Sequence, residues 1–224
     1  MNIIYKIKLY LHLLIYRGLK EKFQYSQNGE DLFLIEYFKD VSKGHYIDIG
    51  AFHPFRSSNT YKLYKKGWSG INIDLSKKTI DLFELARPKD INLNLAVSDK
   101  KKKITIYQNK DMSKWNTINA KWASMYLKNP ILREVDSDTL NNILENYNFK
   151  SNNFHLINID AEGSELSILK NIDFDKYKFK LILTGGQYTE DEQDEVVTLL
   201  NSKNYKYLKS ISDTDIFANK NYSY

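Results

Sequence analysis

Three short apolar segments that each end in an acid constrain this chain most. They read HYID, GINID and FHLINID and end in Asp48, Asp74 and Asp160. Apolar runs of this length predict buried strands, and the carboxyl ends of parallel strands meet at one edge of an α/β sheet. Neighbouring carboxylates repel one another, so a positive or hydroxyl-rich ligand is expected among them.

The remaining patterns extend this reading to a whole sheet. Further strands are predicted at 91–97, 103–107, 179–184, 205–208 and 215–218, and helices at 30–38, 60–66, 77–85, 164–170 and 190–203. Strands that alternate with helices predict an α/β fold with a mostly parallel sheet and right-handed crossovers. The last two strands are expected to form an antiparallel pair. The segment 111–153 is interpreted as an insertion that passes over the functional edge and returns through a helix at 138–147.

The first residues predict an amphipathic helix separate from the main domain. Segment 3–17 reads IIYKIKLYLHLLIYR, which is too short and too charged for a membrane span and lacks a signal-peptide pattern. We therefore expect a helical segment at 1–24 and one domain at 25–224. The helix is expected to pack on its own domain or on the second copy of a homodimer. Peripheral membrane contact is the alternative.

Composition excludes several classes of protein. The 224 residues include no cysteine, which removes disulfides, thiolate metal sites and cysteine nucleophiles. The net charge is +5, but only four of the 33 basic residues are arginine. Arginine is the preferred side chain for phosphate and base recognition, so a sequence-reading nucleic-acid binder is disfavoured. Anionic surfaces or substrates remain open as partners.

The loop after the first strand indicates the kind of cofactor. Asp48 is followed by Gly50 and Ala51, but neither a GxGxxG loop nor a P-loop is present. Asp74 follows Asp48 at roughly the distance at which an acid binds ribose hydroxyls. A ribose without a phosphate cradle favours S-adenosylmethionine over a dinucleotide.

Motifs along most of the chain resemble the FkbM family of S-adenosylmethionine-dependent methyltransferases. These motifs are SQNGED from Ser26, YIDIGAFHP from Tyr46, SNTY from Ser58, GWSGINID from Gly67, NLAVSD from Asn94, IDAEGSE from Ile159 and DIFA from Asp215. The resemblance runs from about Tyr25 to the end. It implies the class I methyltransferase (Rossmann-like) fold, with helices on both faces and an antiparallel last strand. It also implies methyl transfer to an oxygen, typically on a sugar or glycan.

The resemblance implies roles for individual residues. Cofactor binding is expected from the strand-end and N-terminal motifs, namely Gln27, Glu30, Asp48, Gly50, Ala51, Asp74, Leu75, Ser76, Ala96, Val97 and Ser98. A sugar hydroxyl is a weak acid, so a general base is expected, and the candidates are Asp160, Glu162 and His53. We expect no metal, although Asp160, Glu162 and Gln187 would make an oxygen-rich Mg²⁺ set.

One segment departs from the family pattern. The family usually ends the strand at 179–184 with an acid, and here Thr184 or Gly185 takes that place. Such a change predicts an altered acceptor or a weakened activity.

The leading hypothesis is an S-adenosylmethionine-dependent O-methyltransferase for a sugar or glycan hydroxyl in surface-polysaccharide synthesis. Its acceptor would be a carbohydrate or a nucleotide- or lipid-linked sugar, with no nucleic acid involved. Its expected location is the cytoplasm, at the inner face of the membrane. The alternative is a cofactor-binding module that has lost catalysis and acts as a partner subunit. An NAD-dependent enzyme is disfavoured by the glycine pattern.

Overall fold

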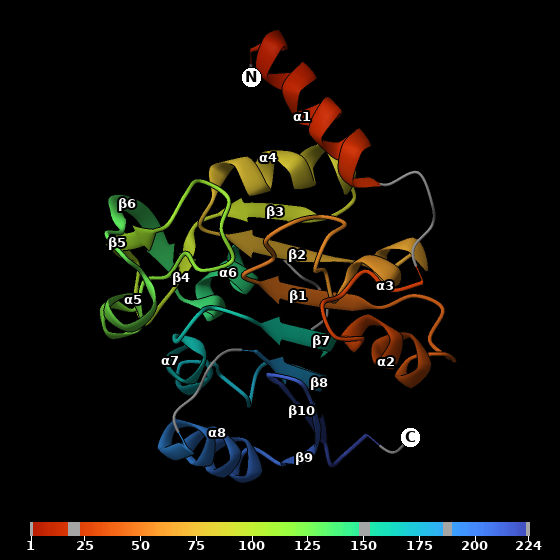
Figure 1. The fold of residues 1–224 in the computed structure, drawn as a ribbon. Coiled ribbons are helices and arrows are strands. Elements are labelled where there is room, and N and C mark those ends of the chain that lie inside the picture. Colours follow the sequence, from red (N-terminus) through yellow and green to blue (C-terminus); the bar gives the residue numbers. More distant parts are fainter. Residues whose placement is uncertain (1, 18–22, 148–152, 186–189, 223–224) are drawn as a thin grey trace.

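A computed structural model describes residues 2–17, 23–147, 153–185 and 190–222. Within these residues, seven strands form a central sheet in the order β3-β2-β1-β7-β8-β10-β9 (Figure 1). Their bounds are β1 His45–Ile49, β2 Ser69–Asp74, β3 Ile91–Asn94, β7 Asn153–Ile159, β8 Lys178–Thr184, β9 Tyr205–Ile211 and β10 Thr214–Asn219. Strands β3, β2, β1, β7 and β8 are parallel, and β10 is antiparallel to β8 and β9. The predicted mostly parallel sheet with an antiparallel last strand is confirmed.

Helices cover both faces of this sheet. Their bounds are α1 Ile3–Arg17, α2 Glu30–Tyr37, α3 Tyr61–Lys65, α4 Lys77–Ala86, α5 Ala120–Tyr126, α6 Leu140–Asn146, α7 Glu165–Lys170 and α8 Glu190–Ser202. Successive strand residues point to opposite faces. In β1, Ile47 and Ile49 therefore join one apolar core with residues of α6, α7 and α8, while Tyr46 joins a second core with residues of α2 and α3.

A second sheet changes the prediction for the middle of the chain. The strand predicted at 91–97 divides at Leu95, and β4 (Ala96–Val97) pairs with β6 (Ile131–Asp138) instead of continuing β3. The strand predicted at 103–107 is β5 (Lys102–Gln108), which pairs antiparallel with β6 rather than joining the main sheet. The strand β6 was not expected at all. Its sequence ILREVDSD is mostly exposed, so it lacks the apolar run that marks a central strand.

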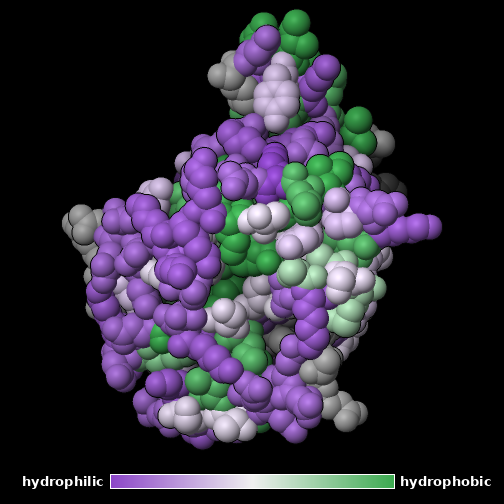
Figure 2. Space-filling model, turned by 90° about the vertical axis from the view of Figure 1, so that its left-hand side faces the viewer, coloured by the Kyte–Doolittle hydropathy of each residue, from purple (hydrophilic) through white to green (hydrophobic). Residues whose placement is uncertain are grey.

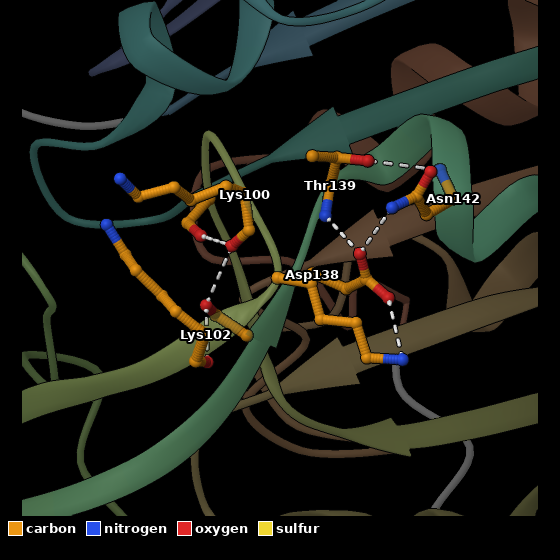
Figure 3. A network of polar contacts seen from close by, with 8 residues as sticks. Lys100, Lys102, Asp138, Thr139 and Asn142 are labelled. Atoms are coloured by element: carbon orange, nitrogen blue, oxygen red, sulfur yellow. Dashed lines mark hydrogen bonds and ion pairs between the residues drawn. The ribbon is translucent and has the colours of Figure 1, made fainter.

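A polar network fixes the junction between β6 and α6 (Figure 3). The Asp138 carboxylate accepts hydrogen bonds from the Thr139 amide at 2.8 Å and from Asn142 Nδ2 at 2.9 Å. Thr139 Oγ1 in turn accepts the Asn142 amide at 3.1 Å. Threonine is a favourable N-cap, so Thr139 caps α6 and the helix begins at Leu140, two residues after Asp138.

The lysine run at 100–103 lies beside this junction, because Lys102 of β5 pairs with Ser137 of β6. The Ser137 hydroxyl lies 3.1 Å from the Lys100 carbonyl oxygen and 2.9 Å from that of Lys102. Lys101 pairs with Asp138 at 4.0 Å, and its side chain stays 76% exposed. The main chain of the run therefore has a structural role, and its side chains form a solvated surface.

Helix α1 packs against α4 and extends beyond the body of the molecule (Figure 1). Leu9 and Leu13 are buried against Phe55 and Leu82. The Tyr5 hydroxyl donates a hydrogen bond to the Asp81 carboxylate at 3.0 Å. One face of α1 therefore packs on the domain, which is one of the two partners expected from the sequence.

The carboxyl ends of β1 and β7 approach very closely at Gly50. This residue has a φ of +78°, and an added Cβ would lie 1.8 Å from the Asp160 carbonyl oxygen. The contact follows from the sheet register, because the Asp160 amide donates to the Ile49 carbonyl at 2.9 Å. Only glycine fits this position, so the first strand of the sheet requires it.

We predict that Gly50→Ala destabilises the protein by several kcal/mol. A left-handed φ costs an L-residue about 1–2 kcal/mol, and the Cβ collision adds to that cost. Gly67→Ala is the matched control, because Gly67 has a φ of +99° but nothing within 4 Å of its added Cβ. Urea unfolding of the two variants should separate collision from backbone strain. Equal losses of unfolding free energy in the two variants would contradict the close approach of Gly50 to the Asp160 carbonyl oxygen.

Candidate active site

A cavity opens at the carboxyl ends of the parallel strands. Figure 2 shows this edge as an apolar hollow framed by hydrophilic surface. Most of the residues expected to bind cofactor line it, together with one candidate base: Gln27, Glu30, Asp48, Gly50, Ala51, Asp74, Leu75, Ala96, Val97 and Asp160. The structure therefore brings together residues that lie as far apart in sequence as Gln27 and Asp160.

The first acid, Asp48, is buried at the end of β1. Its carboxylate accepts hydrogen bonds from Thr60 Oγ1 at 2.6 Å and from Asn158 Nδ2 at 2.9 Å. Burial raises the pKa of Asp48, and these hydrogen bonds oppose the rise. Asn158 Oδ1 accepts from Asn59 Nδ2 at 3.0 Å. This chain of amides fixes the carboxylate in one orientation at the floor of the cavity.

The second acid, Asp74, ends β2. Its two oxygens accept the amides of Phe52 at 2.9 Å and Ser76 at 2.7 Å. Burial raises the pKa of Asp74 to about 6 despite these bonds. Each carboxylate oxygen can accept a further hydrogen bond, so Asp74 can still bind hydroxyl groups. The wall beside it is apolar and consists of Leu75, Leu95, Ala96, Val97 and Ile118.

The third acid, Asp160, follows β7, lines the cavity and is exposed to solvent. Burial, followed by the charges of Asp213 and Asp48, raises its pKa to about 7, while Lys114 opposes the rise. Gly185 provides the room it occupies, because a Cβ there would lie 3.1 Å from Asp160 Cγ. The Asp160 carboxyl group therefore changes from protonated to ionised near neutral pH.

Two further acids follow on the same loop, and neither lines the cavity. Glu165 accepts the amides of Ala161 at 2.7 Å and Gly163 at 3.0 Å, which closes the loop before α7. Burial raises the pKa of Glu165 to about 8. Burial and then the Asp160 charge raise the pKa of Glu162 to about 9, and its main chain has a φ of +49°. Glu162 was a candidate base, and the structure places it outside the cavity lining.

His53, the third candidate base, also lies outside this cavity. Its Nδ1 accepts the amides of Phe55 at 3.0 Å and Arg56 at 3.1 Å, so the ring proton sits on Nε2. That Nε2 lies 3.3 Å from Nε2 of His12 on α1. The imidazole therefore holds a turn and contacts α1 instead of facing the three strand-end acids.

Two serines expected at the cofactor have local roles instead. Ser76 is buried and caps α4 by accepting the Thr79 amide at 3.2 Å. The Ser98 hydroxyl donates to the Lys100 carbonyl at 2.9 Å. Both follow residues that do line the cavity, which explains why sequence position alone placed them there.

The sequence analysis missed several polar residues of the cavity. They are Asn28, Ser57, Asn59, Ser113, Lys114, Asn116, Asn158, Ser164, Asp213 and Thr214. A signal existed for Asn158, which is a polar residue at a buried position of an apolar strand. None existed for Lys114, which the insertion brings to the edge, where it hydrogen-bonds Gln27 Oε1. Burial lowers the pKa of Lys114, although the Asp160 charge opposes this shift.

The insertion is fastened to the loop after β7. Thr117 pairs with Tyr107 of β5 through two main-chain hydrogen bonds of 2.8 and 3.1 Å. Its hydroxyl donates to the Glu162 carbonyl at 2.8 Å. Trp122 is buried beside Gly163, where an added Cβ would lie 2.7 Å from its ring, so it is a packing residue. Trp115 is 52% exposed and remains accessible to a ligand.

The departure at the end of β8 leaves a polar atom without a partner. Thr184 is fully buried, and within the described residues its Oγ1 has no hydrogen-bond partner. The following residue, Gly185, lines the cavity. Gln187, proposed as a metal ligand from sequence, lies outside the described residues. Among the residues that the structure describes, no group of three or more His, Cys, Asp or Glu side chains is suited to a metal.

The sheet order, the antiparallel β10 and the acid-lined cavity at the carboxyl edge define a class I methyltransferase. The sequence model of the methyltransferase FkbM domain matches residues 48–207. The chain therefore belongs to the FkbM family of S-adenosylmethionine-dependent methyltransferases. This confirms the family, the fold and the cofactor predicted from the motifs.

Solved structures with similar folds include two further methyltransferases. One is a TehB-like S-adenosylmethionine-dependent methyltransferase from Corynebacterium glutamicum, with 11% identity, a TM-score of 0.47 and coverage of 98% of this chain and 100% of that chain. Another is a protein from Pyrococcus horikoshii assigned provisionally as an RNA methyltransferase, with 10% identity, a TM-score of 0.45 and coverage of 97% and 99%. No curated protein sequence matches this chain significantly. No helix in the described segments is long and apolar enough to cross a membrane.

Because the pKa values of these acids are raised, we predict that the free energy of unfolding falls as the pH rises. A carboxyl whose folded pKa is raised stabilises the fold when protonated, and this contribution is lost as pH rises from about 4 through the folded value. For Glu162 and Glu165 that loss extends to pH 8–9. The free energy of unfolding should therefore decrease between pH 6 and pH 9, and Glu162→Gln should reduce this decrease by on the order of 1 kcal/mol.

Glu134→Gln is the control, because Glu134 lies exposed on β6. Urea unfolding at several pH values measures the slope for each protein. A slope that Glu162→Gln leaves unchanged would contradict the burial of this carboxyl group.

Proposed function

We propose that this methyltransferase acts on a hydroxyl of a sugar or glycan during surface-polysaccharide synthesis. The observation that carries the proposal is Asp160, a cavity-facing carboxyl group with a pKa of about 7. Transfer to oxygen needs a base that is ionised near neutral pH and still basic enough to accept a proton. Polar residues that line the same cavity, among them Ser113, Lys114 and Asn116, suit a hydroxylated acceptor better than an apolar one.

The cavity fits S-adenosylmethionine in its chemistry. Asp74 would bind the ribose hydroxyls with the free capacity of its carboxylate, and the apolar wall from Leu75 to Val97 would hold the adenine. Asn116 Oδ1 is buried at the cavity and has no hydrogen-bond partner within the described residues, so it is available to a ligand donor. Gly50 and Ala51 would allow the ligand to approach the main chain, and Glu30 and Gln27 would face its amino-acid end. Ser76 and Ser98 have no direct role in this proposal.

When bound, this cofactor supplies a methyl group that its sulfonium has already activated. The protein then has to align the acceptor oxygen and remove its proton. The Asp160 carboxylate would accept the proton of the acceptor hydroxyl as the oxygen is methylated. Lys114 would stabilise that carboxylate before transfer and hold the acceptor near it.

The proposal predicts separate effects for two strand-end acids. Asp74→Ala should weaken S-adenosylmethionine binding by at least about tenfold, because the ribose loses a charge-assisted partner. Asp160→Asn should leave that affinity nearly unchanged, abolish most turnover and remove the rise of kcat with pH near 7. Calorimetry and methyl-transfer assays on sugar acceptors measure these effects, with Asp136→Asn on the exposed strand β6 as the control.

In cells, deleting the gene should remove a methyl group from surface glycans, as measured by mass spectrometry. Restoring the native gene should recover it, whereas the Asp160→Asn gene should not. Glycans that keep every methyl group would contradict the polysaccharide role. Tight cofactor binding without turnover on any acceptor would favour the alternative of a partner subunit, which is motivated by the departure from the family pattern that begins at Thr184.

We further propose that α1 attaches the enzyme to an anionic membrane surface. Opposite its packed face, six aliphatic side chains are 51–74% exposed: Ile3, Ile4, Ile7, Leu11, Leu14 and Ile15. With 3.6 residues per turn these positions form one stripe, and Lys6 and Lys8 lie along its two borders. An apolar stripe bordered by lysines is typical of helices that lie in a membrane interface. The charged borders favour a membrane over a second copy of the same positive helix.

The double substitution Ile7→Ser with Leu11→Ser should reduce binding to anionic phospholipid vesicles by at least about tenfold. It removes two aliphatic side chains that would be buried in the membrane interface. The control is Ile131→Ser with Leu132→Ser, which removes two equally exposed aliphatic side chains from β6. Sedimentation with vesicles measures binding. If the native protein is a dimer in solution and the α1 variant is a monomer, the result would contradict membrane attachment and support self-association through α1.

A further inference from the structure

A second groove adjoins the cofactor cavity on the side of α1. Its lining comes from α1, the loop after β1, the start of α4 and the segment 109–115. Four cations line it, Arg56, Lys78, Lys110 and Lys114, against a single acid, Asp111. We call it the basic groove. It shares Phe52, Ser113 and Lys114 with the cofactor cavity, so a ligand in the groove can reach the edge where Asp160 lies.

The positive charge of the basic groove is not balanced locally. Among the described residues, Arg56, Lys78 and Lys110 take part in none of the ion pairs. Burial and then the charges of Lys78 and Arg56 lower the pKa of His12, which lines the groove from α1. The Arg56 charge also helps to lower the pKa of Lys114. The cationic side chains of the groove therefore extend from the start of α4 to the edge of the cofactor cavity.

Aromatic rings hold part of this charge in place. The Arg56 guanidinium carbon lies 5.2 Å from the Tyr16 ring centre and 5.8 Å from that of Phe52. Stacking of this kind positions the planar group while leaving its N–H donors for a ligand. Trp115 stands half-exposed on the same groove, where a sugar ring or base can pack on it.

We propose that the basic groove binds the phosphate groups of the acceptor, and that the acceptor is a sugar carried on a phosphate or diphosphate ester. The inference rests on the proposed methyl transfer to a sugar hydroxyl. Four cations against one acid suit a dianion or a longer phosphate chain better than a neutral glycan. The phosphates would lie along Arg56, Lys78 and Lys110, and the sugar would extend past Lys114 toward Asp160. A nucleoside diphosphate and a lipid phosphate share this chemistry.

Inorganic pyrophosphate is a probe that does not depend on methyl transfer. Calorimetry should show that the double variant Arg56→Ala with Lys78→Ala binds it at least about tenfold more weakly than the native protein. Neither side chain lines the cofactor cavity, so S-adenosylmethionine affinity should stay unchanged and report intact folding. The matched control, Lys101→Ala with Lys103→Ala, removes the same charge from the second sheet and should bind pyrophosphate as the native protein does.

Failure to bind pyrophosphate, or equal weakening in both double variants, would overturn the groove proposal. A second measurement compares kcat/KM for a nucleoside diphosphate sugar, a lipid-linked sugar phosphate and the free sugar. The native enzyme should prefer the phosphorylated substrates by at least about tenfold in kcat/KM. The double variant Arg56→Ala with Lys78→Ala should lose this preference and keep the kcat/KM for the free sugar. Pyrophosphate binding that depends on the groove, with no transfer to any sugar, would contradict the sugar substrate and leave the phosphate site standing.

Discussion

The contact between the main chains at Gly50 and Asp160 is the constraint on which this active site depends. It closes the gap between β1 and β7 at their carboxyl ends, where no side chain fits. Because the gap is closed, Asp48 and Asp160 end up in one cavity, and Asn158 can bridge from β7 to Asp48. The arrangement of acids is therefore a property of the backbone register, and it follows from one residue without a side chain.

Crowding of the acids then sets their chemistry. Burial raises the pKa of every strand-end acid, but the hydrogen bonds at each differ. Asp48 and Asp74 accept bonds from neighbouring groups that oppose the rise, so they are suited to hold a ligand. For Asp160 the main opposing influence is the charge of Lys114, and its ionisation is left to change near neutral pH. In the proposed mechanism, ligand binding and proton transfer are therefore divided among three acids according to the groups that donate hydrogen bonds to each.

The sequence predicted those parts that depend on local pattern. Apolar strands ending in acids located the edge of the sheet and most of the cavity lining, and two short strands close together at the end of the chain indicated the antiparallel pair. The strand β6 and the position of Lys114 were not predictable, because both depend on pairing between distant polar segments. His53 was misplaced for a different reason. Its position after the first strand was read correctly, but a tight turn directs its ring toward α1.

The way the insertion is fastened has a consequence for the history of such an enzyme. The segment that supplies Ser113, Lys114 and Asn116 is tied to β5 through Thr117 and to the loop after β7, and it contributes no strand to the main sheet. Substitutions there can reshape what the enzyme recognises without disturbing the parallel strands. Selection can thus diversify one half of the site while the other half stays constant, so relatives that share a methyl donor need not share a target.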